Sequence, residues 1–275
     1  MINPANIFKT IFYHLRICFK ENNSMWYNIQ LFIIMNKLIL KSTSTLHKAS
    51  KISLFSYNIE YFGAKSIYIL IKEIFLFHEY NVNLKKDNPL IIDCGSNIGL
   101  SIIYFKKIYP KSKIIAYEAS PFVFPILRNN VMNNNLSDVS VFNLALFDKE
   151  TELPFYFNEN ESQMASLSKG DAASGNQVLV KTIKLSSVFE EFESIDLVKI
   201  DIEGAEIEVI QELALSGYLN KPAQYLIEYH FIENSKSLHL SDFLKAFEIN
   251  GYKYRIKGDY KNKYKQSCIL INFYK

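Results

Sequence analysis

Hydrophobic and polar positions follow one pattern before residue 88 and another after it. Within residues 7–19 and 67–75, apolar side chains recur every three or four positions, which predicts amphipathic helices. Such helices bury one face against a core or against a second subunit. The segment 1–87 is therefore predicted to be a helical, aromatic-rich extension of the domain that follows.

From residue 88 onward, short apolar runs alternate with helical patterns, which predicts repeated βα units and a largely parallel sheet. Strands are predicted at 90–92, 113–117, 139–143, 196–201 and 224–229, with two terminal strands at 252–257 and 268–274. Helices are predicted at 98–108, from Ser120 and Pro121 onward, at 203–215 and at 237–249. The fold class is α/β, with one domain spanning 88–275.

The regular alternation is interrupted between about 150 and 185. Residues 152–158 and 177–184 alternate in the way that a hairpin pair does, and residues 161–176 are polar and contain Gly170 and Gly175. This insertion predicts a hairpin that carries a lid over an acceptor site.

Composition supports a folded chain and places its basic character at one end. The 275 residues are 49% hydrophobic and 21% charged, which excludes a disordered or multi-span membrane protein. Residues 1–90 hold 11 basic against 5 acidic side chains, whereas the remainder holds 20 against 23. The basic excess fits a solvated helix surface, and peripheral contact with anionic lipid or glycan is the alternative.

Cellular location is predicted from three absences in the sequence. The apolar stretches at 29–40 and 67–77 fall short of the roughly 20 residues that span a bilayer. The start of the chain lacks the pattern of a secretory signal. The three cysteines form no CxxC pair and predict neither a disulfide framework nor a cysteine zinc site. A cytoplasmic protein without transmembrane segments is expected.

A glycine loop follows the first strand after residue 88. Gly95 and Gly99 form GxxxG, which differs from the dinucleotide fingerprint GxGxxG, and no phosphate-loop lysine follows. Asp93 adds negative charge at the strand end, which suits a cationic ligand such as S-adenosylmethionine. Glu118, at the end of the next strand, is placed to accept the ribose hydroxyls of a bound nucleoside.

Three segments together resemble the signatures of FkbM-type methyltransferases. They are DCGSNIG at 93–99, YEASP at 117–121 and LVKIDIEGAE at 197–206. The resemblance spans about residues 90–230 and implies a class I methyltransferase fold: a Rossmann-like, seven-stranded sheet with helices on both faces and a final antiparallel hairpin. It implies S-adenosylmethionine as the cofactor and methylation of oxygen. Cys94, Ser96, Tyr117 and Ala119 depart from the residues common in the family, without removing an acid or a glycine that the motif needs.

The same resemblance implies the cofactor-binding residues. Asp93, Gly95, Asn97 and Gly99 are expected to line the methionine end of the cofactor, with Glu118 at the ribose. Asp201 ends the strand before the acidic segment, so its side chain is expected to face the transferred methyl group and to serve the cofactor, catalysis or both.

The catalytic base is left open among neighbouring side chains. Asp201, Glu203, Glu228 and His230 are the candidates, and His230 has an ordinary pKa near neutral pH. A histidine base predicts a rate that rises through about pH 6.5. Glu203 and Glu206 are expected in the first turn of a helix, where acids also favour the helix N-terminus. The sequence spacing of these residues specifies no known metal site, so no metal is predicted.

A sugar or glycan O-methyltransferase is the leading hypothesis, and the substrate class follows from the family resemblance alone. The alternative is a catalytically silent methyltransferase-like domain that binds a partner through its N-terminal helices, by which the chain could also form an oligomer. A nucleic-acid methyltransferase is disfavoured, because the half of the chain with the motifs is net acidic and lacks an Asn-Pro-Pro-Tyr type of loop. The expected partner is a small-molecule or glycan acceptor.

Overall fold

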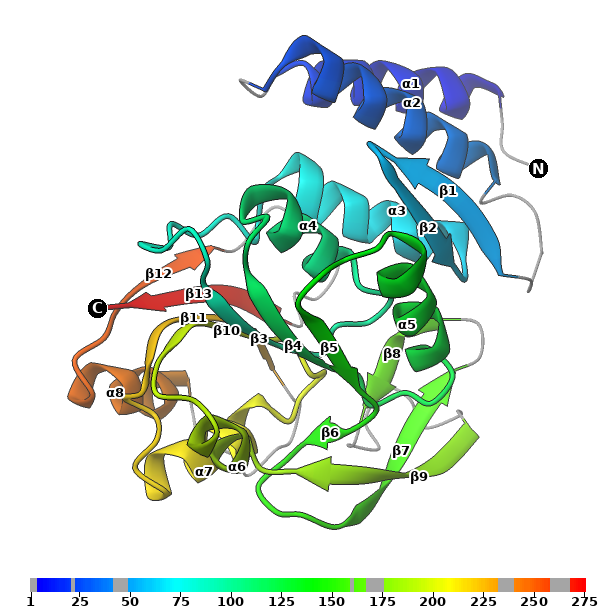
Figure 1. Ribbon diagram of the computed structural model, residues 1–275. Helices are drawn as coiled ribbons and strands as arrows, with labels where there is room; N and C mark the ends of the chain where they lie inside the picture. The colour runs from blue at the N-terminus through cyan, green and yellow to red at the C-terminus, as the bar shows by residue number, and fades with distance from the viewer. Residues whose placement is uncertain are drawn as a thin grey trace.

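A seven-stranded sheet forms the centre of the molecule (Figure 1). The computed structural model describes residues 4–20, 23–41, 49–158, 161–166, 176–231, 240–257 and 268–275. The strands of the sheet are β3 (Leu90–Cys94), β4 (Lys113–Tyr117), β5 (Val139–Phe142), β10 (Ile195–Ile200), β11 (Pro222–His230), β12 (Lys253–Lys257) and β13 (Cys268–Tyr274). Their order is β12-β13-β11-β10-β3-β4-β5.

The first five of these strands in the chain run parallel, and β13 pairs antiparallel with both β11 and β12. Successive side chains of a strand enter different cores: Leu197 of β10 joins the cluster on one face and Val198 the cluster on the other. Burial on both faces explains why these strands appear in the sequence as apolar runs. The predicted sheet and its antiparallel terminal hairpin are confirmed.

Helices cover both faces of the sheet (Figure 1). One face carries α4 (Leu100–Ile108) and α5 (Phe124–Asn133), and the other carries α6 (Leu185–Glu190), α7 (Glu206–Leu215) and α8 (Leu240–Ile249).

The start predicted for α5 is wrong by three residues. Ser120 accepts from the backbone N–H of Val123 at 3.3 Å and of Phe124 at 3.0 Å, so it caps a turn that precedes the helix.

The N-terminal segment packs on the same face as α4 and α5. Its elements are α1 (Pro4–Cys18), α2 (Met25–Lys41), β1 (Ser50–Leu54), β2 (Tyr57–Tyr61), α3 (Ala64–Ile71) and the π-helix η1 (Lys72–Leu76). The expected helices are present, but the expectation of a purely helical segment is wrong, because β1 and β2 form an antiparallel hairpin. Asn130 of α5 holds this hairpin through Glu60, accepting from its backbone N–H at 2.7 Å and donating to its carbonyl at 2.9 Å.

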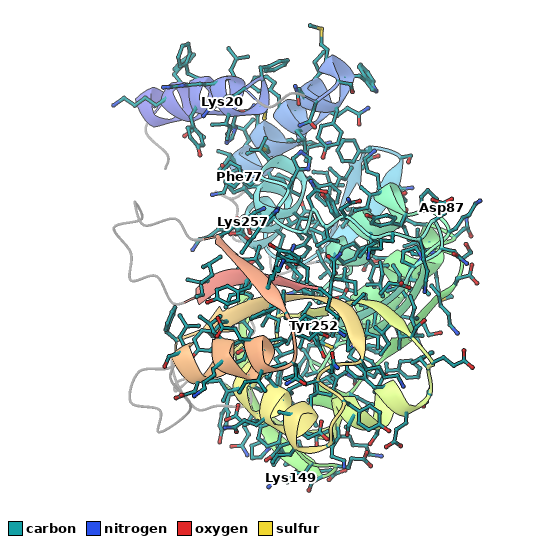
Figure 2. The ribbon with its side chains drawn as sticks, turned by 90° about the vertical axis from the view of Figure 1, so that its left-hand side faces the viewer. Lys20, Phe77, Asp87, Lys149, Tyr252 and Lys257 are labelled. Carbon is teal, nitrogen blue, oxygen red and sulfur yellow. The ribbon has the colours of Figure 1, made fainter. Side chains whose placement is uncertain are left out.

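The N-terminal segment shares its core with the sheet. Cys18, Leu31 and Ile71 belong to one hydrophobic cluster with Ile91 and Leu226 of the sheet. Figure 2 shows α1 and α2 at one end of the molecule, near Lys20, with Lys149 at the opposite end. Within the described residues, no helix combines the length and the apolarity that crossing a bilayer requires.

A smaller four-stranded sheet accounts for the insertion. Its strands are β6 (Ala145–Leu146), β7 (Glu152–Asn158), β8 (Glu161–Ser166) and β9 (Asn176–Ile183), in the order β6-β9-β7-β8. The predicted hairpin pairing is confirmed, since β7 and β9 pair antiparallel from Glu152 opposite Lys181 to Phe157 opposite Asn176. Residues 161–166, predicted as the start of the lid, instead form β8, which pairs antiparallel with β7. Residues 167–175 of the predicted lid lie outside the described residues, and the role of the lid stays a prediction.

Candidate active site

The glycine loop joins β3 to α4 and is tied to the end of β4. The backbone N–H groups of Gly95 and Ser96 both donate to the carbonyl of Tyr117, at 3.0 and 2.9 Å. Gly95, Asn97 and Gly99 all have positive φ, at 80°, 49° and 89°. This conformation curls the loop over the strand end and starts α4 directly after Gly99. The predicted order of strand, glycine loop and helix is therefore present.

Glu118 connects the loop to the second strand. Its carboxylate accepts two backbone hydrogen bonds, from Asn97 at 2.9 Å through Oε2 and from Ser120 at 2.8 Å through Oε1. Burial raises the pKa of Glu118 to about 7, against the two backbone hydrogen bonds, which lower it. Each carboxylate oxygen has a second lone pair, so the group can still accept hydrogen bonds from a ligand.

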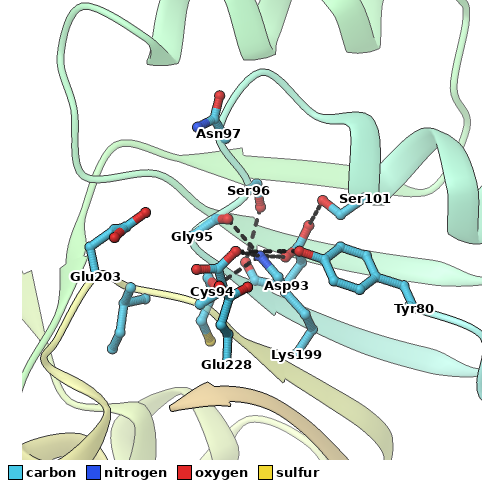
Figure 3. Close-up of polar contacts among 12 residues, drawn as sticks. Tyr80, Asp93, Cys94, Gly95, Ser96, Asn97, Ser101, Lys199, Glu203 and Glu228 are labelled. Carbon is cyan, nitrogen blue, oxygen red and sulfur yellow. Dashed lines mark hydrogen bonds and ion pairs between the residues drawn. The ribbon is translucent and has the colours of Figure 1, made fainter. Parts of the chain in front are cut away.

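Lys199 lies at the centre of the polar contacts beneath the loop (Figure 3). Its ammonium group is 3.4 Å from Oδ1 of Asp93 and 3.4 Å from Oδ2 of Asp201, and it donates to the carbonyl of Gly95 at 2.7 Å. Asp93 is fully buried and also accepts from the hydroxyl of Ser101 at 2.5 Å. The contacts of Asp93 thus hold the loop from below, and its predicted contact with a cofactor stays a prediction.

Asp201 follows β10 and lies directly against the loop. Its backbone N–H donates to the carbonyl of Cys94 at 3.1 Å, and its carboxylate accepts from the hydroxyl of Tyr80 at 3.3 Å. A parallel sheet brings the carboxyl ends of neighbouring strands to one edge, which is why residues a hundred positions apart meet here. Asp201 is accordingly next to the predicted cofactor loop.

The acidic segment after β10 is a turn and not yet a helix. Glu203 has φ 57° and Gly204 has φ 104°, and α7 begins only at Glu206. The placement of Glu203 in the first helical turn is therefore wrong. Glu206, which is 1% exposed, organises the turn by accepting from the backbone N–H groups of Ile202 and Gly204, each at 3.1 Å.

His230 is the last residue of β11 and faces the same turn. Its Nδ1 lies 3.0 Å from Oε1 of Glu206, and its Nε2 lies 3.3 Å from Oε2 of Glu203 and 3.8 Å from Oε1 of Glu228. Burial lowers the pKa of His230, but the hydrogen bond and charge of Glu206, with the charges of Glu203 and Asp201, outweigh it and raise this pKa to about 11. The imidazole is thus protonated at neutral pH, and the predicted titration near pH 6.5 is wrong for this arrangement.

The N-terminal segment contributes residues that the sequence interpretation missed. Tyr80 reaches Asp201, and Glu73 of η1 lies close enough to the site that its pKa rises to about 8 through burial and then through the charges of Glu79, Glu228 and Asp201. The available signal was the pair Lys72 and Glu73 inside an otherwise apolar helix. π-Helical turns such as η1 often occur at functional sites.

Two groups of side chains have the spacing of metal ligands. In the first, Asp201, Glu203 and His230 each offer one ligand atom, and these atoms lie within 4.8 Å of one another. The second group is formed by Glu228, His230 and Cys268. Both lie at the ends of neighbouring strands, where the sequence spacing predicted no metal.

Comparison with known proteins identifies methyltransferases as relatives of this chain. The sequence profile of the methyltransferase FkbM domain matches residues 93–254, which include the loop, Glu118, the acidic turn and His230. Methyltransferase sdnD of Sordaria araneosa is 32% identical over 205 residues, covering 63% of this chain and 77% of that protein. The 2-O-methyltransferase NoeI of Sinorhizobium fredii is 27% identical over 143 residues, covering 46% of this chain and 58% of that protein.

A solved structure shares the whole architecture. The crystal structure of methyltransferase FkbM from Methylobacillus flagellatus aligns with 98% of this chain and 60% of its own, with a TM-score of 0.52 and 14% sequence identity. At this identity the likeness concerns the fold, which is that of the class I methyltransferases. With the profile match over more than half of its length, the chain belongs to the FkbM family of methyltransferases.

Proposed function

We propose that this methyltransferase moves the methyl group of S-adenosylmethionine to a hydroxyl oxygen of a sugar or glycan. The observation that carries the proposal is the buried Glu118 carboxylate, which is bound to the glycine loop through Asn97 and to its own strand end through Ser120. An acid in this position at the end of the second strand suits a ribose.

The residues at the loop fit the cofactor by charge and by hydrogen-bonding capacity. S-adenosylmethionine carries sulfonium and ammonium groups, and two acidic residues contact the loop region: Asp201 through its backbone N–H to Cys94, and Glu118 through its carboxylate to Asn97. Gly95 and Gly99 let the loop pack closely against the backbone of Asp201 and the side chain of Leu127. Asp93, Asn97 and the two glycines complete the proposed cofactor site, with Lys199 holding the loop backbone in place.

The bound cofactor supplies an electrophilic methyl group on a sulfonium. The protein must align an acceptor hydroxyl with it and take up the proton that the hydroxyl loses. Alignment alone contributes roughly 7 to 11 kcal/mol in well-oriented reactions. In this proposal Asp201 and Glu203, at the edge of the site, orient the hydroxyl and receive its proton, and His230, 3.3 Å from Glu203, holds that side chain.

Two observations support a hydroxylated acceptor. Burial, and then the charge of Asp201 among others, raises the pKa of Glu73, Glu79 and Glu228, so these acids lie near Asp201. Carboxylates accept hydrogen bonds from the hydroxyls of a sugar. The name of the relative NoeI specifies 2-O-methylation by that protein. The sugar class is proposed from the family resemblance alone. Transfer of labelled methyl from the cofactor to glycans should give an alkali-stable ether, whereas an alkali-labile product would indicate an ester.

Glu118→Ala is expected to weaken S-adenosylmethionine binding at least tenfold. The substitution removes the acceptor for the ribose hydroxyls, and a hydrogen bond to a charged group contributes about 1.5 to 3 kcal/mol. Titration calorimetry with the full chain measures the change. Glu193→Ala, which removes an exposed carboxylate, is the matched control and should bind as the wild type does. Equal affinity in folded Glu118→Ala would overturn the assignment of this residue, and no binding by the wild type would favour a silent domain.

Cofactor affinity is also expected to depend on pH through Glu118. Because its pKa is raised to about 7, this carboxyl is ionised above that pH and protonated below it. The protonated form accepts ribose hydroxyls less well, so affinity should fall about tenfold from pH 8 to pH 6, at roughly 1.4 kcal/mol per pKa unit. Calorimetry across this range checks it. Glu118→Gln, which does not titrate, should lose most of the dependence; an unchanged slope would contradict the prediction.

A further inference from the structure

Three metal-ligating side chains converge where the proposed acceptor meets the methyl group. Asp201 follows β10, Glu203 lies in the turn after it, and His230 ends β11, the neighbouring strand. We infer that His230 Nε2, with one carboxylate oxygen each from Asp201 and Glu203, binds a divalent transition-metal ion. The inference deepens the proposed function by adding an ion to the same site.

The distance between Nε2 of His230 and Glu203 lies in the range that a shared ion requires and exceeds that of a direct charged hydrogen bond. Metal–ligand distances of about 2.0 to 2.2 Å put neighbouring ligand atoms roughly 3.0 to 3.6 Å apart and opposite ones up to about 4.4 Å apart. Nε2 of His230 is 3.3 Å from Glu203 Oε2, and the three ligand atoms lie within 4.8 Å of one another. A direct N–H···O bond between a charged pair is usually about 2.7 to 2.9 Å long.

The orientation of His230 is a second observation, because its other ring nitrogen contacts a residue outside the three proposed ligands. Nδ1 of the ring lies 3.0 Å from Glu206, a carboxylate that is 1% exposed and is itself fixed by two backbone N–H groups. A histidine that binds a metal through Nε2 commonly donates from Nδ1 to such a carboxylate, which fixes the ring and its tautomer. Glu206 is thus a positioning residue, and Nε2 is directed towards Glu203.

An ion can reach this position and leave it. The side chains of Asp201, Glu203 and His230 are 21%, 38% and 14% exposed, so none of the three ligands is sealed off from solvent. The two contacts of the Asp201 carboxylate, from Lys199 and Tyr80, both involve Oδ2 within the described part of the chain. The other oxygen therefore remains for a ligand.

The donor set selects the class of metal. One imidazole with two carboxylates suits Mn²⁺, Fe²⁺, Co²⁺ or Zn²⁺, whereas Ca²⁺ and Mg²⁺ favour oxygen ligands alone. The second group, Glu228, His230 and Cys268, shares the same Nε2 side of the ring but fits less well, because the Cys268 thiol already donates to Glu228 at 2.9 Å. Its Cys268 also lies on β13, which is separated from β10 by β11.

An ion here would assist the acceptor hydroxyl as a Lewis acid. A divalent cation draws electrons from a bound hydroxyl and makes its proton easier to lose. In the proposed reaction the S–CH₃ bond breaks with its electron pair left on sulfur, the C–O bond forms, and the hydroxyl proton passes to a carboxylate of the site. The ion neutralises part of the acidic charge and replaces the proton on Nε2.

Manganese binding by the metal-free full chain tests the inference without cofactor or acceptor. Electron paramagnetic resonance and calorimetry with Mn²⁺ at pH 7.5 are expected to show one saturable site, and spin-echo spectra should show coupling to one imidazole nitrogen. His230→Ala should remove the nitrogen coupling and weaken binding at least tenfold, and Glu203→Gln should weaken it at least tenfold. Glu206→Gln, which disturbs the orientation of the ring, is expected to cost about 10- to 100-fold.

The controls separate this site from others. Glu193→Gln, at an exposed position, and Cys268→Ser, in the second group, should both bind Mn²⁺ as the wild type does. Absence of a saturable site, or a bound ion without nitrogen coupling, overturns the inference, as does loss of binding in Cys268→Ser alone. S-adenosylmethionine binding is measured in parallel, so that a protein that binds the cofactor but no Mn²⁺ contradicts the metal site and leaves the proposed function intact.

Discussion

Lys199→Met is expected to lower the free energy of unfolding by about 3 to 5 kcal/mol at neutral pH, the range for removing one partner of a buried ion pair. Lys199 is 2% exposed, and it is the cation beside the fully buried Asp93. Methionine fills a similar volume but leaves the Asp93 carboxylate without an opposite charge and the Gly95 carbonyl without its donor. Chemical denaturation measures the loss.

A second lysine provides the control for burial. Lys86 is closer to its partner, at 3.0 Å from Asp196, but its side chain is 49% exposed. An exposed ion pair contributes about 0 to 1 kcal/mol, so Lys86→Met should cost less than that despite the shorter distance. Asp93→Asn in the Lys199→Met background should recover part of the stability. Similar losses for the two lysine variants would show that burial does not decide the effect.

The sheet was predictable because its signal is local. The run at 113–117 predicts β4 residue for residue, and the alternation within 152–158 predicts the pairing of β7 with β9. Burial on two faces leaves a continuous apolar run in the sequence, and burial on one face leaves an alternation, so each type of strand can be recognised without its neighbours.

The hairpin of β1 and β2 was missed because its turn lacks the usual residues. The two-residue connection is Phe55 and Ser56, and Phe55 adopts φ 55°, a conformation in which glycine or asparagine is normally found. Stacking of Phe55 on Tyr27 of α2, with ring centroids 4.6 Å apart, holds this turn. That contact joins residues 28 positions apart in the sequence, so no local sequence pattern predicts it.

The candidate site, like the fold, was predictable only where the sequence signal is local. The positions of Gly95, Glu118 and Asp201 follow from strand ends, which the sequence marks, whereas the charge of His230 follows from side chains on another element. Its partner Glu206 is 24 residues away in the sequence, at the first position of α7. A local sequence pattern can therefore predict where the residues of this site lie in the fold, but it cannot predict their pKa values.

Gly95→Ala is expected to destabilise the protein by about 2 kcal/mol or more beyond the cost of Gly217→Ala. Both glycines have left-handed backbone, with φ 80° and 79°, so each variant carries the same strain of about 1 to 2 kcal/mol for an alanine in that conformation. The two positions differ in the space that is available for a Cβ atom. A Cβ at Gly95 would lie 1.7 Å from the carbonyl oxygen of Asp201, a backbone atom, whereas nothing lies within 4 Å of a Cβ at Gly217.

The difference between these two variants therefore measures how tightly the glycine loop packs against the end of β10. To relieve the clash, Gly95→Ala must move the loop away from Asp201, which also disturbs the contact between Lys199 and the Gly95 carbonyl. Cofactor affinity should then fall at least tenfold in Gly95→Ala and stay unchanged in Gly217→Ala, which lies at the far end of α7. Denaturation and calorimetry on both variants check the two effects. Equal stability losses would mean that the loop and Asp201 are not in contact in solution, and the site as described would not exist.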